Sequence, residues 1–153
     1  GLEQPYMLLI PGASEHREAK RWPVERFAEL AKRVADAGVT PAIIGGKAEG
    51  KIAQDILKLE KRAKSLVTRT DLFQIVTLAE KAAFVVGNDT GPMHMAAIAG
   101  GPGVALFATN ESNPDHAAPR GARSPIINSA PTLAELEVDT VWRSILALGV
   151  LPT

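Results

Sequence analysis

The hydrophobic residues of this chain fall into short apolar runs that alternate with longer stretches of helical spacing. The short runs are typical of buried strands, and they lie at residues 7–10, 39–44, 65–68, 83–86, 103–107 and 125–127. The stretches with one apolar helical face lie at residues 23–37, 48–61, 72–79 and 138–148, and Asp71 is expected to cap the third of them. Strict alternation of strand and helix predicts an α/β domain with three layers, in which helices cover both faces of a parallel sheet of about six strands.

Residues 84–107 show this alternation most clearly. An apolar run ends in a polar turn at 88–91, a helix of small residues is expected next, and Gly-Gly-Pro-Gly stops that helix before a second apolar run. Two strands joined by a helix in this way are parallel. Because open α/β sheets bind ligands at the carboxyl ends of their strands, we expect residues 88–94 to face a ligand. Residues 109–124 hold many turn formers and predict a long loop.

Composition narrows the possible classes of function. The 153 residues fit one domain, and the 17 basic and 17 acidic residues cancel, so no overall field favours nucleic acid or acidic membranes. The absence of cysteine excludes disulfides and thiolate metal sites and fits a cytoplasmic location. No stretch resembles a signal peptide or a membrane span, so we expect a soluble domain. The chain begins with Gly1, which suggests that it is part of a longer protein.

Lys20 is the first candidate for a role in binding, because it lies on the loop that follows the first predicted strand. Its ammonium group is suited to neutralising a diphosphate. Gly12 allows the backbone to approach a ligand closely, and the Ser14 hydroxyl can donate to a phosphate. The alternative is that Lys20 is an ordinary solvated surface lysine.

The second candidate is the turn of Asp89, Thr90 and Gly91, which precedes the predicted small-residue helix. Free N–H groups and the helix dipole make such a helix start favourable for phosphate, although Asp89 or Thr90 could simply cap the helix. His94 lies one turn further on and could be a buried core histidine. Because the Lys20 loop is predicted at the same sheet edge, we favour a ligand-facing role for His94.

Glu49 follows the Gly45-Gly46 turn after the second predicted strand. An acidic residue at this place is similar to the one that accepts ribose hydroxyls in nucleotide-binding folds, but the dipole of the next helix explains it equally well. The chain has neither of the common glycine-rich phosphate loops, no serine hydrolase motif, no zinc-binding histidine spacing and no D-x-D pair. We therefore expect no metal and no cofactor, with phosphate charge neutralised by Lys20, backbone amides and the helix terminus.

Three segments taken together resemble the donor-binding half of the bacterial ADP-heptose:lipopolysaccharide heptosyltransferases of glycosyltransferase family nine. The segments are residues 11–14 (PGAS), 20–23 (KRWP) and 88–94 (NDTGPMH). The resemblance extends from about Tyr6 to Leu148. It implies a GT-B enzyme of two domains, of which residues 1–153 are the carboxyl-terminal, Rossmann-like donor domain. The amino-terminal domain, which binds the acceptor and supplies the general base, is then outside this chain.

The resemblance also implies roles for individual residues. Diphosphate and sugar contacts fall to Ser14 and Lys20, the ribose contact to Glu49, the adenine pocket to Leu72, and the lining of the diphosphate and heptose to Asp89, Thr90, Gly91 and His94. Lys20 and Asp89 are the implied catalytic residues. The implied reaction is an inverting displacement at the anomeric carbon, in which Lys20 and backbone amides stabilise the leaving ADP in place of a metal.

The implied partners are ADP-heptose and, through the other domain, a lipid-linked or oligosaccharide acceptor at the inner face of the bacterial inner membrane. Peripheral membrane contact is expected of the parent protein, and nucleic acid is not expected as a partner. This domain alone is expected to bind donor but hardly to turn it over. Two alternatives stay open: a related enzyme that uses another nucleotide sugar, such as a UDP-sugar, and a non-catalytic nucleotide-binding module.

Overall fold

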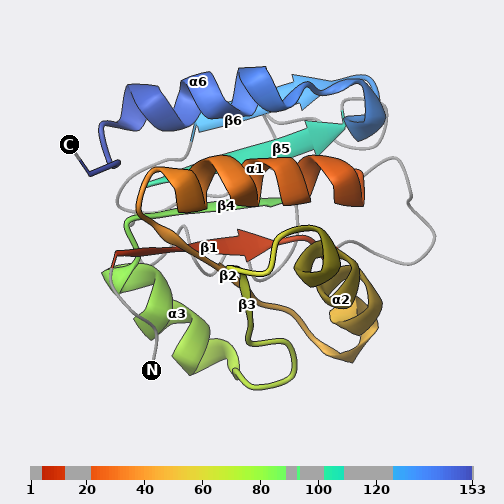
Figure 1. Cartoon of the computed structure of the whole chain (residues 1–153), viewed down its shortest axis with the longest axis vertical. Helices are drawn as coiled ribbons and strands as arrows, with labels where there is room; N and C mark the ends of the chain where they lie inside the picture. The colour runs from red at the N-terminus through yellow and green to blue at the C-terminus, as the bar shows by residue number, and fades with distance from the viewer. Residues whose placement is uncertain (1–4, 13–21, 89–92, 94–101, 109–125, 153) are drawn as a thin grey trace.

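A computed structural model describes residues 5–12, 22–88, 93, 102–108 and 126–152 (Figure 1). Six strands form one sheet in the order β3-β2-β1-β4-β5-β6, and every neighbouring pair is parallel. The strands are β1 Tyr6–Ile10, β2 Thr40–Ile43, β3 Lys64–Ser65, β4 Phe84–Asn88, β5 Gly103–Ala108 and β6 Ile126–Ala130. This is the strand order of doubly wound nucleotide-binding folds. Strands β2 and β3 are added on one side of β1, and β4, β5 and β6 on the other, so the direction of strand addition reverses between β1 and β4.

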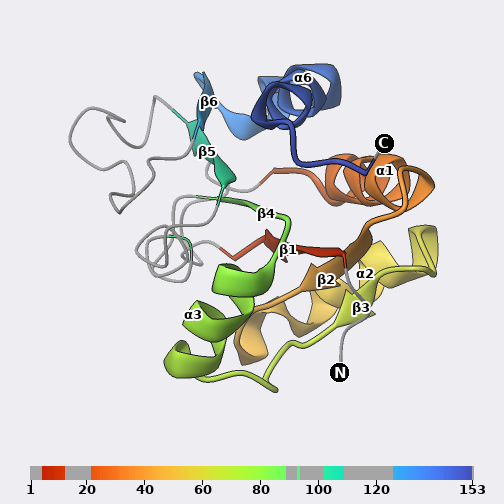
Figure 2. The same cartoon turned by 90° about the vertical axis from the view of Figure 1, so that its left-hand side faces the viewer.

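Helices cover both faces of the sheet. They are α1 Val24–Asp36, α2 Gly50–Leu59, α3 Leu72–Lys81 and α6 Val138–Leu148, with short 3-10 turns at η2 Lys47–Glu49 and η3 Leu133–Glu135. Figures 1 and 2 show α1, α2 and α6 on one side of the sheet and α3 on the other. The Rossmann-like α/β fold with three layers and a parallel sheet of six strands is therefore confirmed.

The central strand β1 explains why the two faces form separate cores. All five of its residues are buried, and successive side chains point to opposite faces. Met7 and Leu9 belong to the core under α1, α2 and α6, whereas Leu8 and Ile10 belong to the core under α3. A strand that is apolar at every position must lie inside a sheet covered on both sides.

Trp22 fixes the chain where it enters α1. Its side chain is 1% exposed, and its indole Nε1 donates to the carbonyl oxygen of Leu136 at 2.9 Å. The ring also meets the Phe27 ring edge to face, with 5.0 Å between centroids. Because Leu136 lies just before α6, these contacts tie the start of α1 to the start of α6.

Several local predictions are confirmed and others need correction. Asp71 caps α3, since its side chain accepts from the Gln74 amide at 2.8 Å and the Gln74 side chain accepts from the Asp71 amide. The second helix was expected from residue 48, but the chain first makes the η2 turn and α2 starts at Gly50. The small-residue helix before β5 and the loop at 109–124 lie outside the described residues, apart from the helical Met93.

The third and sixth strands differ from the predicted ranges. The third was expected at residues 65–68 but covers only Lys64–Ser65, because Thr68 turns the chain with a φ of 64°. The Leu66 amide still donates to the Ile43 carbonyl at 2.8 Å, so the chain continues alongside the end of β2. The sixth was expected at residues 125–127 but is longer, at Ile126–Ala130, since five residue pairs join it to β5 at the edge of the sheet.

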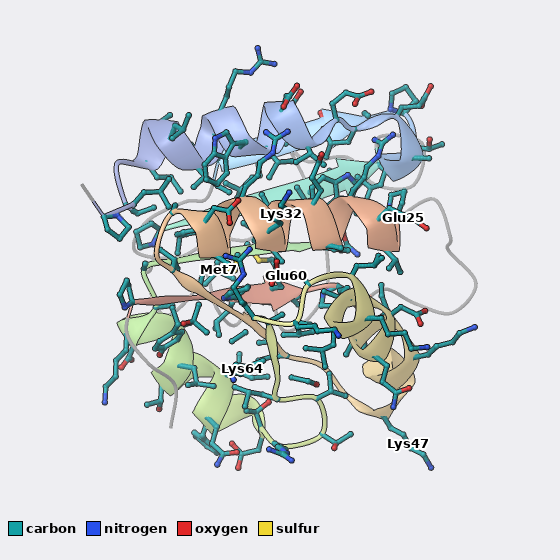
Figure 3. The ribbon with its side chains drawn as sticks, viewed as in Figure 1. Met7, Glu25, Lys32, Lys47, Glu60 and Lys64 are labelled. Carbon is teal, nitrogen blue, oxygen red and sulfur yellow. The ribbon has the colours of Figure 1, made fainter. Side chains whose placement is uncertain are left out.

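A charged cluster ties α1 to the end of α2. Glu60 is 7% exposed and accepts two hydrogen bonds from the Arg62 guanidinium, whose Nη1 lies 2.9 Å from Asp36. The hydrogen bonds from Arg62 hold the pKa of Glu60 below its ordinary value, and the nearby charge of Lys32 acts in the same direction (Figure 3). Because α2 ends at the amino edge of the sheet, this cluster has a role in packing and leaves the carboxyl edge free for binding.

In the part of the chain that the structure describes, no helix has the length and apolar character needed to cross a membrane.

Gly87 of β4 packs directly against Ile10 of β1, and this contact gives a test of the fold. A Cβ there would lie 2.7 Å from Ile10 Cβ and 3.1 Å from Ile10 O, neither of which can move freely. We expect Gly87→Ala to lower the free energy of unfolding by about 1–3 kcal/mol, the usual cost of overpacking. Gly46→Ala is the control, because nothing lies within 4 Å of a Cβ there. Urea denaturation of both variants checks this, and equal losses would contradict the close approach.

Candidate functional site

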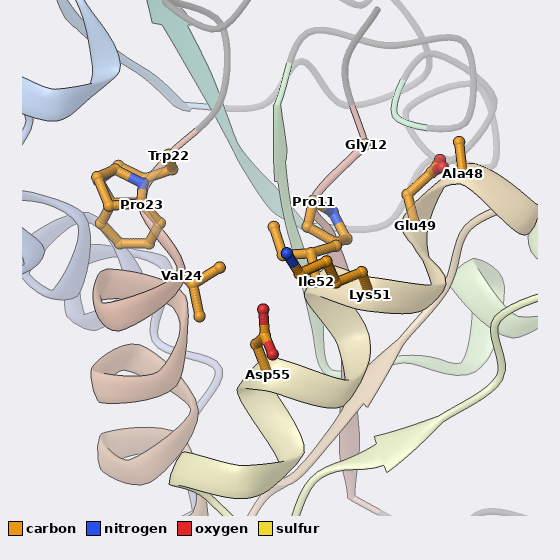
Figure 4. A pocket seen from close by; sticks show the side chains of 10 residues that line it. All are labelled: Pro11, Gly12, Trp22, Pro23, Val24, Ala48, Glu49, Lys51, Ile52 and Asp55. Carbon is orange, nitrogen blue, oxygen red and sulfur yellow. The ribbon is translucent and has the colours of Figure 1, made fainter. Parts of the chain in front are cut away.

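A cleft of about 450 Å³ opens at the carboxyl edge of the sheet, between the first turns of α1 and α2 (Figure 4). Its lining comes from the end of β1, the start of α1, and the η2 turn with α2. The lining residues are Pro11, Gly12, Trp22, Pro23, Val24, Ala48, Glu49, Lys51, Ile52 and Asp55. A ligand in the cleft would therefore touch the segments that follow β1 and β2, where ligands bind in folds of this kind.

Segment 13–21 begins and ends at the walls of this cleft. Gly12, which precedes the segment, and Trp22, which follows it, both line the cleft. The buried contacts of Trp22 hold the second of these ends firmly. Both described residues that flank the sequence with Ser14 and Lys20 therefore lie at the cleft.

Glu49 lies between the two glycines that follow β1 and β2. A Cβ on Gly12 would lie 2.6 Å from Glu49 Oε1, and a Cβ on Gly45 would lie 2.9 Å from Glu49 Cβ. The Glu49 side chain therefore lies directly against both glycines, with its carboxylate at Gly12 and its Cβ at Gly45. Glu49 stands at the N-cap of α2 but makes no side-chain capping hydrogen bond, which weighs against the interpretation that it only serves the helix.

The chemistry of the cleft is mixed. Figure 4 shows the Lys51 ammonium and the Asp55 carboxylate pointing into the cleft from α2, opposite the apolar side chain of Val24. Lys47, one turn earlier, projects away from the body of the domain and takes no part (Figure 3). A half-buried carboxylate such as that of Glu49 is a hydrogen-bond acceptor, which suits a ligand that presents hydroxyl groups.

The ends of β1 and β4 meet beside the cleft. The Asn88 side chain is fully buried, and its Nδ2 donates to the Pro11 carbonyl oxygen at 2.9 Å. This contact joins the residue before segment 89–92 to the end of β1, at the place where the strand order reverses. The two segments predicted to bind phosphate therefore start from neighbouring points.

The structure describes only part of the predicted site. Glu49 lies in the cleft, and Leu72 is the first residue of α3, the helix that follows β3 at the same edge. The other predicted residues lie outside the described residues, namely Ser14, Lys20, Asp89, Thr90, Gly91 and His94. Sequence reasoning missed Gly45, Lys51 and Asp55. A glycine directly after a strand was the available signal for Gly45, whereas nothing in the sequence distinguished the other two from surface charges.

Within the described ranges, no three His, Cys, Asp or Glu side chains lie close enough together to hold a metal ion.

Comparison with known proteins decides the family. The model of glycosyltransferase family 9 (heptosyltransferase) matches residues 1–140. The chain belongs to glycosyltransferase family 9. It is 35% identical over 130 residues to lipopolysaccharide heptosyltransferase 2 of Escherichia coli K12, a match that covers 82% of this chain and 36% of the relative. It is 31% identical to lipooligosaccharide heptosyltransferase 2 of Haemophilus influenzae, with 82% of this chain and 37% of the relative covered.

Solved structures of the family have the same fold. The structure of E. coli ADP-heptose lps heptosyltransferase II matches with a TM-score of 0.84 and 29% identity, over 97% of this family 9 chain and 47% of that chain. E. coli heptosyltransferase WaaC with ADP matches with a TM-score of 0.83 and 23% identity, over 94% and 44%, which shows the fold alone. The chain spans less than half the length of these proteins.

The placement of Glu49 can be tested through its two glycine neighbours. The clash at Gly12 involves the mobile end of the Glu49 side chain, whereas the clash at Gly45 involves its Cβ. We expect Gly12→Ala to change the free energy of unfolding by less than about 0.5 kcal/mol, and Gly45→Ala to lower it by about 1–3 kcal/mol. Chemical denaturation measures both, and a loss for Gly45→Ala as small as that for Gly12→Ala would show that Glu49 lies elsewhere.

Proposed function

We propose that this chain is the donor-binding half of an inverting heptosyltransferase that transfers heptose from ADP-heptose to a lipopolysaccharide core acceptor. The family match supports the reaction class, and related proteins carry the names heptosyltransferase 2 and ADP-heptose lps heptosyltransferase II. The observation that carries the proposal is the order of the candidate residues along the carboxyl edge of the sheet.

That order follows the chemical order of a nucleotide diphosphate. Leu72, proposed for the adenine, follows β3, and Glu49, proposed for the ribose, follows β2. The segment with Ser14 and Lys20 follows β1, and the turn that starts at Asp89 follows β4. The strands are ordered β3-β2-β1-β4, which supports a row of proposed contacts that runs from base to ribose to diphosphate. Four strands spaced about 4.8 Å apart span about 14 Å, which suits an extended nucleoside diphosphate.

The reaction that we propose is a single displacement at the anomeric carbon. An acceptor hydroxyl oxygen forms the new bond to that carbon while the bond to the ADP oxygen breaks, and ADP leaves with the electron pair. The hydroxyl proton goes to a base in the other half of the parent enzyme. Lys20 and the amides of Thr90 and Gly91 stabilise the charge that develops on ADP, and Asp89 and His94 line the sugar. Stabilisation of developing charge is usually the largest catalytic effect.

The length of the chain supports a division of labour within the parent protein. The match covers 47% of the related E. coli structure, so an acceptor-binding domain is proposed in the remainder of the parent. In this proposal residues 1–153 form one donor domain, and turnover needs both halves. The parent acts at the cytoplasmic face of the inner membrane, where its acceptor is anchored, and contacts the membrane only peripherally.

Nucleotide titration by calorimetry tests this proposal. We expect the chain to bind ADP more tightly than UDP. Lys20→Ala should weaken ADP binding at least about tenfold, because a hydrogen bond to a charged group is worth about 1.5–3 kcal/mol. Lys81→Ala is the matched control, since Lys81 is exposed at the far end of α3, and it should leave the affinity unchanged.

The remaining outcomes separate the alternatives. Tighter binding of UDP would favour a related enzyme with a UDP-sugar donor. Binding of ADP by a parent protein that transfers no heptose would favour a non-catalytic nucleotide-binding module. Absence of nucleotide binding, or ADP binding that is indifferent to Lys20→Ala, would overturn the proposal.

A further inference from the structure

Lys51 lies where the physics of a helix disfavours a cation. It is the second residue of α2, and the start of a helix carries the positive end of the helix dipole. The first turn of α2 holds no acidic residue, and the carboxylate of the N-cap residue Glu49 lies at Gly12. Lys51 also makes no ion pair with any residue that the structure describes. Helix stability therefore does not explain this lysine, and positions that break a local rule are often functional.

The direction of the Lys51 side chain sets it apart from an ordinary surface lysine. Figure 4 shows its ammonium pointing into the cleft, and the Asp55 carboxylate, one turn later in α2, points into the same cleft. The cation nearest to Asp55 is Lys58, with 3.9 Å between Asp55 Oδ1 and Lys58 Nζ. Lys51 and Asp55 are thus not consumed by an ion pair with each other, and both groups face the cleft.

The charges of the cleft indicate what kind of group fits there. Among the described residues that line it, Glu49 and Asp55 are acidic and Lys51 is the basic one, so negative charge exceeds positive charge. An excess of negative charge repels phosphate. A hydroxyl group, in contrast, can accept a hydrogen bond from an ammonium and donate one to a carboxylate. The cleft volume of about 450 Å³ is typical of small-molecule sites.

We infer that Lys51 is a specificity-determining residue for the nucleotide, and that its ammonium donates to a ribose hydroxyl while the ribose hydroxyls donate to the Glu49 carboxylate. This inference rests on the proposed function, in which Glu49 contacts the ribose. Ribose is the neutral, hydroxyl-bearing part of ADP. The heptose also carries hydroxyls, but it is joined to the far end of the diphosphate, whereas the cleft follows β1 and β2, on the ribose side of the proposed row.

Such a contact makes the site selective for ribonucleotides. A nucleotide that lacks the ribose hydroxyls leaves the ammonium and the carboxylate without partners in the cleft, and sites built to hydrogen-bond a hydroxyl discriminate strongly against analogues without it. Lys51 adds a donor to the acceptor that Glu49 supplies. The pair therefore recognises both hydrogen-bonding functions of a hydroxyl group.

The test compares ADP with 2′,3′-dideoxy-ADP by calorimetric titration of the whole 153-residue chain. We expect Lys51→Met, which keeps most of the aliphatic stem and removes the charge, to weaken ADP binding about tenfold and to change dideoxy-ADP binding by less than about twofold. Lys47→Met is the matched control, because Lys47 lies four residues earlier and projects away from the domain (Figure 3). It should leave both affinities unchanged.

Urea denaturation of the same variants separates binding from structure. Because Lys51→Met removes a cation from a helix start, it should not lower the free energy of unfolding. A clear loss of stability would assign Lys51 a structural role and overturn the inference.

Three binding results would also overturn the inference. The first is an unchanged ADP affinity in Lys51→Met. The second is an equal loss for ADP and dideoxy-ADP, which would assign Lys51 to the diphosphate. The third is the same loss in Lys47→Met, which would reveal a general effect of charge. In each case a wild-type chain that binds ADP leaves the proposed function standing, whereas a wild-type chain that binds neither nucleotide would overturn the proposed function and the inference with it.

Discussion

The pairing of β1 with β4 is the constraint on which the structure depends. These strands come from distant parts of the chain, yet they form the centre of the sheet and are buried on both faces. From this pair the sheet extends through β2 and β3 on one side and through β5 and β6 on the other. The described cleft lies beside this pair, at the carboxyl ends of β1 and β2. Gly87, which packs directly against Ile10, and Asn88, which donates to the Pro11 carbonyl oxygen, join the ends of β1 and β4 next to it.

The position of Glu49 depends on this centre. Its Cβ fits beside Gly45, at the end of β2, only because that residue lacks a Cβ, and its carboxylate lies against Gly12 at the end of β1. The carboxylate therefore faces the cleft at a place set by the sheet and not by the helix that it precedes. The start of the Glu49 side chain is thus placed before a ligand arrives, and only its carboxylate end has to adjust on binding.

The sequence was sufficient for the fold class, because patterns of two kinds alternate without interruption and strongly apolar runs end at glycine or proline. The N-cap at Asp71 was equally readable, since an Asp directly before an apolar helical pattern is a common helix start. The length of β3 could not be predicted from the sequence, because Thr68 adopts a left-handed turn conformation that threonine does not favour. The cleft was also beyond sequence reasoning. Lys51 and Asp55 look like ordinary helix-surface charges until α1 is packed opposite them.

The central claim is that a nucleotide diphosphate binds along the carboxyl edge of the sheet. Titration of the isotope-labelled chain with ADP, followed by NMR of the glycine amides, tests it most directly. Gly12 and Gly45 lie at that edge, whereas Gly38 and Gly149 follow the ends of α1 and α6 at the opposite edge. The account predicts shifts for the first pair and none for the second. Shifts confined to Gly38 and Gly149 would contradict it.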